Sequence, residues 1–417
     1  MATTQPSLPD LGRRAKDASR LLALAPTATK DDALHGAADL LQARHHEILE
    51  ANGADVTRAD QAGTAAAVVD RLRLDRDRLA AMAAGLRDIA SLRDPVGEVL
   101  EGWTRPNGIH IDRVRVPLGV VGIIYENRPN VTSDAAGLCL KSGNAAFLRG
   151  SSAALASNQA IAAVLREALA KAGLAQDSVV LVEDTSRHSA VEFMGLRGVI
   201  DCLIPRGGPS LIATVLEHAT VPYVVDGEGN CHVYVDASAD VDMALSLVHN
   251  AKTSRPSVCN AAESLVVHEA VAQQFLPLVA SALAGVELVG DEAARRIVAS
   301  IGEATEEDFG REFLGPKMSV AVVASLEEAI AHVNRFGSGH SEAIVTSDLG
   351  AAHRFTREVD AAAVLVNAST RFVDGGEFGF GAEIGISTQK LHARGPMGLR
   401  ELTTTKYVVH GDGQIRL

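Results

Sequence analysis

Cys259 is the residue in this chain best suited to act as a nucleophile. It follows a polar segment that carries Lys252 and Arg255, and nearby positive charge raises the fraction of a thiol that is ionised at neutral pH. The other cysteines lie in or against apolar runs, where a thiol behaves as a small hydrophobic group; they are Cys139, Cys202 and Cys231. A fourth structural cysteine is the alternative interpretation of Cys259, and composition alone favours it.

Length and composition predict a globular protein of two or three domains. The chain has 417 residues, of which 47% are hydrophobic and 22% charged, which excludes a disordered protein. No apolar run is long enough for a membrane span, and the polar start of the chain lacks the layout of a secretory signal. The four cysteines have the spacing of neither a disulfide framework nor a zinc site. We therefore expect a cytoplasmic protein without a bound metal, and the net charge of −13 argues against nucleic acid as a partner.

The elements that must position these residues form two α/β series after an alanine-rich helical section at 10–94. The first series ends with a predicted strand at 222–226, and its helices are predicted at 131–142, 153–172, 186–195 and 209–218. The second series runs from 231 to 369. Near-continuous apolar strands separated by helices are typical of parallel sheets covered on both faces, which bind ligands at the carboxyl ends of their strands. The dinucleotide fingerprint G-x-G-x-x-G occurs nowhere in the chain, so a nucleotide on the first sheet requires a variant glycine turn.

Several motifs, in their order and spacing, resemble the aldehyde dehydrogenase superfamily. They are GIIYENRPN, AAFLRGSS, SRPSVCNAAES, EFLGP and AAVLVNAST. Further strings are similar to the γ-glutamyl phosphate reductase family within it, namely IPRGG, GNCHVYVD, RFGSGHSEAIVT, EIGIST and LHARGPMGLRELTT. Each string alone is a weak signal, but together they make the resemblance specific from about residue 100 onward.

The resemblance implies an α/β, aldehyde dehydrogenase-like fold in three parts. Residues 1–102 and 119–228 would form a Rossmann-type cofactor-binding domain with the N-terminal helical layer, and 229–400 an α/β catalytic domain. Residues 103–118 and 401–417 would form a small β oligomerisation element. Because an exposed strand edge is a template for pairing, we expect a homo-oligomer, a dimer or a tetramer.

The resemblance also implies the reaction. It is the NADP-dependent reduction of L-glutamyl 5-phosphate to L-glutamate 5-semialdehyde and phosphate through a cysteine thioester, the second step of proline biosynthesis. Cys259 takes the place of the nucleophile, and Asn127 that of the asparagine that stabilises the oxyanion together with the backbone amide of the nucleophile. A turn residue is the alternative interpretation of Asn127. Glutamate 5-kinase, which would hand over the substrate, is an implied partner.

Cofactor contacts are implied for Arg149, Ser151, Ser152, Arg206, Gly207, Gly208 and Glu312. Arg149 stands where relatives have a lysine at the adenosine ribose, and a guanidinium beside hydroxyls suits a 2′-phosphate, which favours NADP over NAD. A solvated arginine, with Ser152 capping the next helix, is the alternative. Gly207 and Gly208 permit close approach of an anion to a helix N-terminus. Leu314 replaces a phenylalanine that is common in relatives.

Substrate contacts are less specific. The candidate cations are Arg128, Lys252, Arg255, His340 and Arg371, and Glu126 is a candidate for the substrate ammonium. A surface or structural role is the alternative for each.

The fate of the thioester is predicted from a missing glutamate. Hydrolytic relatives carry one in an E-L-G-G segment upstream of the nucleophile, whereas this chain has Val225, Asp226 and Gly227 there. We therefore expect phosphate rather than water to be the acyl acceptor. A displaced base at Asp226 or Glu228 would instead give a non-phosphorylating aldehyde dehydrogenase. A nucleotide-binding scaffold without catalysis is the alternative of a different class.

Overall fold

The computed structural model describes residues 6–416, which divide into two compact units. Unit 1 comprises the chain up to Val225, Phe380–Gly385 and the segment from Met397 onward; unit 2 comprises Asp226–Gly379 and Ile386–Pro396. The first division lies close to the predicted domain boundary at 228/229. The later segments differ from the prediction, because 380–385 and 397–400 belong to unit 1.

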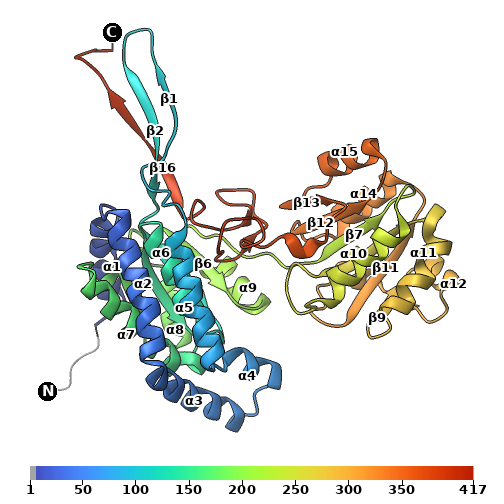
Figure 1. The fold of residues 1–417 in the computed structure, drawn as a ribbon, viewed down its shortest axis with the longest axis horizontal. Coiled ribbons are helices and arrows are strands. Elements are labelled where there is room, and N and C mark those ends of the chain that lie inside the picture. The colour runs from blue at the N-terminus through green and yellow to red at the C-terminus, as the bar shows by residue number, and fades with distance from the viewer. Residues whose placement is uncertain (1–5, 417) are drawn as a thin grey trace. The chain divides into compact units, whose positions relative to one another are not determined.

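The N-terminal layer of unit 1 is helical, as predicted (Figure 1). Its helices are α1 (Leu8–Leu22), α2 (Thr27–Ala43), α3 (His45–Gln61), α4 (Ala66–Leu72) and α5 (Arg76–Ser91). Apolar residues at helical spacing cover the inner faces, for example Leu79, Met82 and Leu86 on α5. Asp75 begins α5 by accepting a hydrogen bond from the backbone N–H of Arg78.

The sheet of unit 1 has four parallel strands in the order β5-β4-β3-β6. They are β3 (Val120–Tyr125), β4 (Ala145–Gly150), β5 (Val179–Leu181) and β6 (Cys202–Arg206). The connecting helices are α6 (Asn130–Lys141), α7 (Leu155–Lys171), α8 (Arg187–Met194) and α9 (Pro209–His218), with single 3₁₀ turns η1 (Ser152–Ala154) and η2 (Gln176–Ser178). Counted from β3, the strand order 3-2-1-4 is that of a Rossmann half-sheet.

The predicted strand at 222–226 is wrong. This segment follows β6 for only one residue pair, Leu203 with Tyr223. Pro222 contributes a carbonyl to the backbone N–H of Leu203 but has no N–H of its own to extend a ladder. Beyond it, Asp226 already belongs to unit 2, where it forms a single bridge with Ser387.

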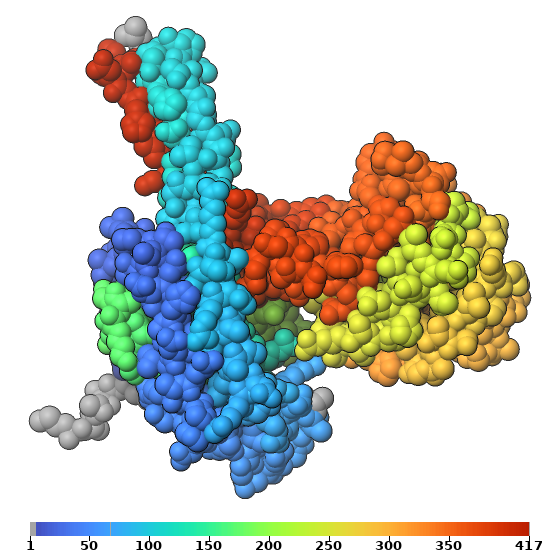
Figure 2. Space-filling view, viewed as in Figure 1, coloured from blue at the N-terminus to red at the C-terminus, as the bar shows by residue number. Residues whose placement is uncertain are grey.

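A three-stranded antiparallel sheet extends from the rest of unit 1 (Figures 1 and 2). Its strands are β1 (Val99–Thr104), β2 (His110–Pro117) and β16 (Thr403–His410), with β2 in the middle. The hairpin therefore begins at Val99, four residues before the predicted segment 103–118. The outer edges of β1 and β16 pair with no other strand of the described residues.

Unit 2 is built on a seven-stranded parallel sheet in the order β10-β9-β11-β8-β7-β12-β13. The strands are β7 (Cys231–Val235), β8 (Ala262–His268), β9 (Glu287–Gly290), β10 (Gly302–Glu303), β11 (Lys317–Val323), β12 (Ser341–Val345) and β13 (Ala363–Val366). The helices are α10 (Val241–Thr253), α11 (Glu269–Ala282), α12 (Glu292–Ile297), α13 (Glu306–Phe309), α14 (Leu326–Phe336) and α15 (Leu349–Glu358). The remaining elements are η3 (Thr370–Phe372), β14 (Ile386–Ser387) and β15 (Gly395–Pro396).

Both faces of this sheet are covered, as the sequence predicts. Val233 and Val235 of β7 lie in one buried apolar cluster, whereas Tyr234 between them lies in another on the opposite face. The first cluster includes residues of α10 and α11, and the second includes residues of α14 and α15. Of the helices between residues 6 and 416, none has the length and apolar character of a membrane span.

Candidate active site

The predicted site residues of unit 1 lie at the carboxyl ends of its strands. Glu126 and Asn127 follow β3, Arg149 is the last residue but one of β4 with Ser151 just beyond the strand, and Arg206 ends β6. β3 is paired with β4 on one side and β6 on the other, which makes this edge the switch point at which such sheets bind nucleotides. The predicted location on the first sheet thus agrees with the observed topology.

Asn127 adopts a left-handed backbone conformation with φ of 46°, which asparagine tolerates better than most residues. Its backbone N–H donates to Oγ of Ser151 at 3.3 Å, and that hydroxyl donates to Oδ1 of Asn127, also at 3.3 Å. Asn127 is therefore a turn residue whose side chain is held at the end of β3. A turn and a ligand-facing role are compatible at such a position.

Glu126 lies against the predicted cofactor turn. The backbone N–H of Gly208 donates to Oε2 of Glu126 at 3.1 Å, just before α9 begins. A Cβ on Gly207 would lie 2.6 Å from the same oxygen, so a larger residue at this position would have to displace the Glu126 carboxylate. The carboxylate occupies the N-terminal end of a helix, where an anion is stabilised by the helix dipole.

Arg149 is not a solvated arginine, because only 8% of the residue is exposed. Its Nη2 donates to the carbonyl oxygen of Ser186 at 2.8 Å, and its Nε has no hydrogen-bond partner among the described residues. Burial lowers the pKa of Arg149, and the carboxylate of Asp184 opposes this effect. Ser152 does not cap the next helix, since α7 begins at Leu155 and has Ala154 at its N-cap.

Three predicted site residues of unit 2 lie at the opposite ends of their strands. Cys259 precedes β8, Glu312 precedes β11 and His340 precedes β12, so all lie near amino ends. Gly229 comes before β7 in the same way, and β11, β8, β7 and β12 are consecutive neighbours in the sheet. The sheet order therefore brings together loops that are far apart in the sequence. The candidate residues of unit 1 thus lie at carboxyl ends of strands, whereas these three residues of unit 2 lie at amino ends.

Cys259 differs from the other three cysteines in its exposure. It is half-buried, whereas Cys139, Cys202 and Cys231 are buried as predicted, and none of the four, all within the described residues, is in a disulfide. Burial raises the pKa of Cys202 to about 12 and also raises the pKa values of Cys139 and Cys231. Those three thiols are protonated and inert at neutral pH, which leaves Cys259 as the candidate nucleophile.

The backbone of Cys259 is fixed by the segment before β7. Sγ of Cys231 donates to the carbonyl oxygen of Cys259 at 3.1 Å. A Cβ on Gly229 would lie 1.7 Å from that oxygen, so only glycine allows the two segments to approach so closely. The sequence analysis did not identify either contact; the glycine pair in GEGNC was the available signal.

Glu312 and Glu263 connect the loop before β11 to the segment before β7 and to β8, respectively. Oε1 of Glu312 accepts from the backbone N–H of Gly229 at 2.9 Å, and burial raises the pKa of Glu312, an effect to which Glu228 adds. Oε1 of Glu263 accepts from the backbone N–H of Leu314 at 3.1 Å. Leu314 itself has a left-handed φ of 54° and an exposed side chain.

Lys252 forms a fully buried ion pair with Glu263, in which Nζ lies 2.6 Å from Oε2. Burial lowers the pKa of Lys252 and raises the pKa of Glu263 to about 7, although each charge partly offsets the effect on the other. The ammonium of Lys252 therefore points into the protein and not toward solvent. Glu263 is a further residue that the sequence analysis did not single out.

The structure brings Arg371 to the nucleophile loop. Nε of Arg371, in η3, donates to Oγ of Ser254 at 3.2 Å. Asn260 adds a second tie, because its Nδ2 donates to the carbonyl oxygen of Val373 at 2.9 Å. Arg255 on the same loop is exposed. Two guanidinium groups therefore lie on the segments next to Cys259 in unit 2.

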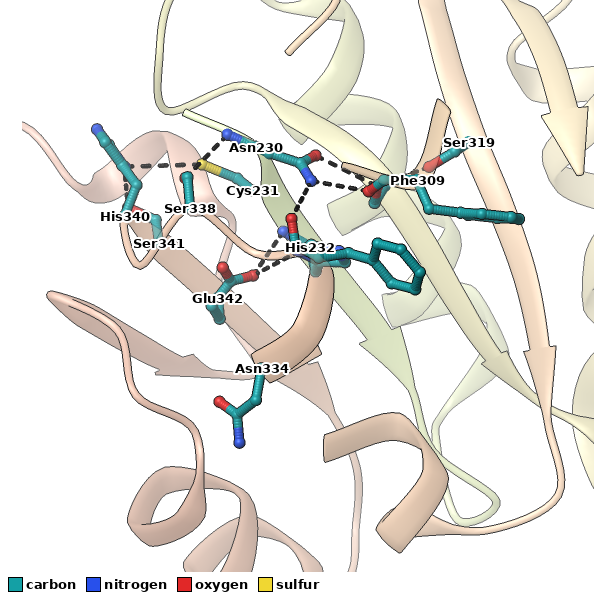
Figure 3. A network of polar contacts seen from close by, with 12 residues as sticks. Asn230, Cys231, His232, Phe309, Ser319, Asn334, Ser338, His340, Ser341 and Glu342 are labelled. Atoms are coloured by element: carbon teal, nitrogen blue, oxygen red, sulfur yellow. Dashed lines mark hydrogen bonds and ion pairs between the residues drawn. The ribbon is translucent and has the colours of Figure 1, made fainter. Parts of the chain in front are cut away.

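His340 is buried and lies beside Cys231 and Ser341 (Figure 3). Its Nδ1 lies 2.7 Å from Oγ of Ser341 and 3.7 Å from Sγ of Cys231. Burial lowers the pKa of His340 to about 4, so the ring carries no charge at pH 7. His340 is accordingly a structural neighbour of Cys231 and not a cation under these conditions.

Comparison with known proteins identifies the family. The model of the aldehyde dehydrogenase family matches residues 3–307 and 297–408. The γ-glutamyl phosphate reductase of Clostridium beijerinckii is 56% identical over 407 residues, which are 97% of this chain and 98% of the relative. That of Caldanaerobacter subterraneus is 53% identical over 406 residues, with the same shares covered.

A solved structure agrees with these relatives. The crystal structure of γ-glutamyl phosphate reductase from Thermotoga maritima matches with a TM-score of 0.97 at 48% identity, over 99% of this chain and 100% of that chain. The predicted aldehyde dehydrogenase-like α/β fold and the predicted family are thereby confirmed. The chain belongs to the aldehyde dehydrogenase family and, within it, to the γ-glutamyl phosphate reductases.

Proposed function

We propose that this chain reduces γ-glutamyl phosphate to glutamate 5-semialdehyde and phosphate, with Cys259 as the nucleophile. The observation that supports this proposal most strongly is the position of Cys259. All four cysteines lie within the described residues, and Cys259 alone among them is partly exposed. Hydrogen bonds hold its loop on both sides. The high identity to named reductases over nearly the whole chain supports the same reaction.

The proposed chemistry begins with addition of the Cys259 thiolate to the acyl carbon of the substrate. The C–O bond to phosphate then breaks, phosphate leaves with the bonding electrons, and a thioester remains on Sγ. When bound, the reduced nicotinamide would supply the hydride that brings this thioester to the level of the aldehyde. The C–S bond then breaks, which releases glutamate 5-semialdehyde and restores the Cys259 thiolate. The backbone amide of Cys259 and the side chain of Asn127 are the proposed donors to the developing oxyanion.

A nicotinamide cofactor fits the carboxyl edge of the sheet in unit 1. Gly207 and Gly208 open the backbone before α9, and Ser151 and Ser152 follow β4. Arg206 completes the proposed set in unit 1. Because the carboxylate of Glu126 lies at the N-terminal end of α9, a pyrophosphate bound there would have to displace it. In unit 2 we propose that Glu312 holds the nicotinamide ribose.

NADP is the proposed form of the cofactor. Arg149 presents an Nε without a partner among the described residues, next to the start of α8. Arg187 and His188 lie in the first turn of α8 and are exposed. These donors together suit a 2′-phosphate better than a bare ribose diol.

For the substrate, Arg371 and Arg255 are the proposed anion contacts, because they lie on the segments around Cys259. Arg128 and Glu126 remain proposed contacts in unit 1. We propose that Lys252 acts indirectly, since its ammonium is bound by Glu263, and that His340 supports Cys231 instead of binding an anion.

A single assay tests the function and its alternative. Oxidation of glutamate 5-semialdehyde with NADP should require inorganic phosphate and should yield the acyl phosphate. Because the chain has Val225, Asp226 and Gly227 where hydrolytic relatives carry a glutamate, we propose that water is left without the usual base. Steady turnover to glutamate in buffer free of phosphate and arsenate would instead establish the hydrolytic activity. Loss of all activity in Cys259→Ser, with the fold intact, would exclude a non-catalytic scaffold.

We also propose that the chain assembles through β1, β2 and β16 as a dimer or tetramer. The unpaired edges of this sheet within the described residues support pairing across subunits. A glutamate 5-kinase remains a proposed partner for delivery of the acyl phosphate. Co-elution of the two enzymes in gel filtration would test that association.

A further inference from the structure

Glu342 is a buried carboxylate whose two oxygens have different environments (Figure 3). The residue is 1% exposed. Its Oε2 accepts hydrogen bonds from the backbone N–H of His232 at 2.7 Å and from Nδ1 of the same residue at 2.9 Å. No donor of the described residues lies within hydrogen-bond distance of Oε1. Because an unpartnered buried oxygen is costly, a ligand at Oε1 would stabilise the carboxylate.

A cavity of about 320 Å³ is lined by Glu342. The rest of its lining comes from the end of α14, the loop that follows it and the end of α15, namely Val333, Asn334, Gly337, Gly339, Val359 and Asp360. A Cβ on Gly337 would lie 2.7 Å from Oε1 of Glu342. Glycine at this position therefore avoids a close contact between a side chain and the unpartnered oxygen.

The charged side chains of the cavity lining are carboxylates. The lining contains two of them and no lysine, arginine or histidine. The last turn of α14, which contributes Val333 and Asn334, carries the partial negative charge of a helix C-terminus. Asp360 already binds Lys390 at 2.5 Å and Arg394 at 2.9 Å. Glu342 is thus the carboxylate in the cavity that has an oxygen left for a ligand.

These features select the kind of cation. Divalent and transition-metal ions prefer several carboxylate, histidine or cysteine ligands, and residues 6–416 contain no such group of three side chains. One carboxylate with backbone carbonyls and water suits a singly charged ion. The cavity volume greatly exceeds the ~30 Å³ that one water occupies in the liquid, so it has room for a hydrated ion or a small organic ammonium. We propose that Oε1 of Glu342 and the last turn of α14 bind a small monovalent cation, either an alkali metal ion or a primary ammonium group.

The test compares the melting temperature of the full chain in different chloride salts at constant ionic strength. Choline chloride is the reference salt, because choline is too bulky for close contact with Oε1. Potassium, rubidium, ammonium or methylammonium chloride then replaces it. A cation that binds the native state raises the melting temperature with its concentration and then saturates. We expect such a rise for at least one small cation in the wild type, its loss in Glu342→Gln, and its retention in Glu358→Gln. Glu358 is a matched control because it lies on α15, binds Arg354 and does not line the cavity.

Diffraction provides a second measurement that does not depend on folding of the variant. An anomalous peak within coordination distance of Oε1 in wild-type crystals grown with rubidium chloride would identify an alkali metal ion. A melting response to methylammonium without a rubidium peak would identify an ammonium ligand. Equal responses in the wild type and a folded Glu342→Gln, or neither response nor peak in the wild type, would overturn the proposal.

Discussion

The reactivity of Cys259 is the property on which the chemistry depends at the scale of single residues. Because Cys139, Cys202 and Cys231 are buried and their pKa values are raised, we expect iodoacetamide to alkylate Cys259 alone and rapidly near pH 7.5. Peptide mass mapping after short exposure measures the site. Cys259→Ser should fold with an unchanged melting temperature and show no reduction of γ-glutamyl phosphate. Alkylation of a buried cysteine first would contradict the assignment.

Cys231 is predicted to be a positioning residue for the nucleophile. Removing its thiol in Cys231→Ala breaks the 3.1 Å hydrogen bond to the carbonyl oxygen of Cys259. The loop that carries Cys259 is then held less firmly. We expect kcat to fall by about tenfold, which corresponds to about 1.4 kcal/mol of transition-state stabilisation, with KM nearly unchanged.

Two variants separate this role from general destabilisation. Cys231→Ser keeps a donor and should recover most of kcat. Cys139→Ala, which truncates a thiol buried in unit 1, should lower stability while leaving kcat close to wild type. A parallel fall in kcat and melting temperature for both alanine variants would assign Cys231 a packing role only.

At this scale the sequence predicted which cysteine is exposed, but not the contacts that hold it. The sequence around Cys259 is polar and that around the other cysteines is apolar, so the difference in exposure can be predicted from neighbouring residues. The roles of Cys231 and Gly229 depend instead on a strand pairing that places residues 229–231 against residue 259. Likewise, His340 looks like a cation in the sequence, and only its burial makes the ring neutral.

Among the secondary-structure elements, the Lys252–Glu263 pair joins α10 to β8 below the nucleophile loop. Glu263→Gln should lower the free energy of unfolding by about 3 to 5 kcal/mol, because it leaves the ammonium of Lys252 buried without a charge partner. Urea denaturation measures this loss. Lys252→Met combined with Glu263→Leu should recover part of it, whereas Glu327→Gln, which removes a surface pair with Arg354, should have little effect. Equal losses for Glu263→Gln and Glu327→Gln would show that the buried pair is not ionised.

The loop after α14 should make stability depend on pH. Burial lowers the pKa of His340 to about 4 from an ordinary value near 6.5, so the unfolded chain binds a proton in this range that the folded chain excludes. The contribution to stability is therefore complete above about pH 6.5 and is lost as the pH falls toward 4. His340→Asn should reduce the loss of unfolding free energy between pH 7.5 and pH 5 by about 2 kcal/mol.

Urea denaturation at both pH values, with His353→Asn as the control, measures this difference. His353 lies exposed on α15, so its replacement should leave the pH dependence as in the wild type. An unchanged pH dependence in His340→Asn would mean that the ring is charged or accessible in the folded protein.

Element boundaries were predictable where the sequence carries its own stop and start signals. Asp240 caps α10 and Pro209 begins α9, and α9 spans the residues predicted for it, 209–218. The strand predicted at 222–226 was wrong because its apolar residues match a strand pattern, whereas Pro222 lacks the backbone N–H that a strand needs for pairing. The location of Cys259 at the amino ends of strands was equally hidden, since it depends on the order in which seven strands pair.

For the whole molecule, the chain returns to unit 1 twice after leaving it, at 380–385 and from 397 onward. Such returns leave no local signal in the sequence, because they are fixed by long-range pairing such as that of β16 with β2. The family resemblance predicted the fold class and a β element. Only the structure shows that this element starts at Val99 and that the chain returns twice to unit 1.

The three-stranded sheet carries the last prediction, which concerns assembly. Several large apolar side chains on it are exposed: Val99, Trp103, Tyr407 and Val409. Trp103 and Tyr407 contact each other edge to face, with ring centroids 6.2 Å apart, and so form an apolar patch across β1 and β16. Light scattering at micromolar concentration should therefore give a mass two or four times the 43.6 kDa of one chain.

The assembly can be separated from the fold by charge on this patch. Val409→Asp places a carboxylate on β16, where 57% of the wild-type residue is exposed, so it should leave the single chain folded but unable to bury the patch against a partner. We expect the measured mass to fall toward that of one chain. Leu24→Asp is the matched control, because Leu24 is also exposed but follows α1, away from the sheet; it should keep the assembled mass. A wild-type particle of 43.6 kDa, or a Val409→Asp variant that assembles as the wild type does, would show that the edges of β1 and β16 do not hold subunits together.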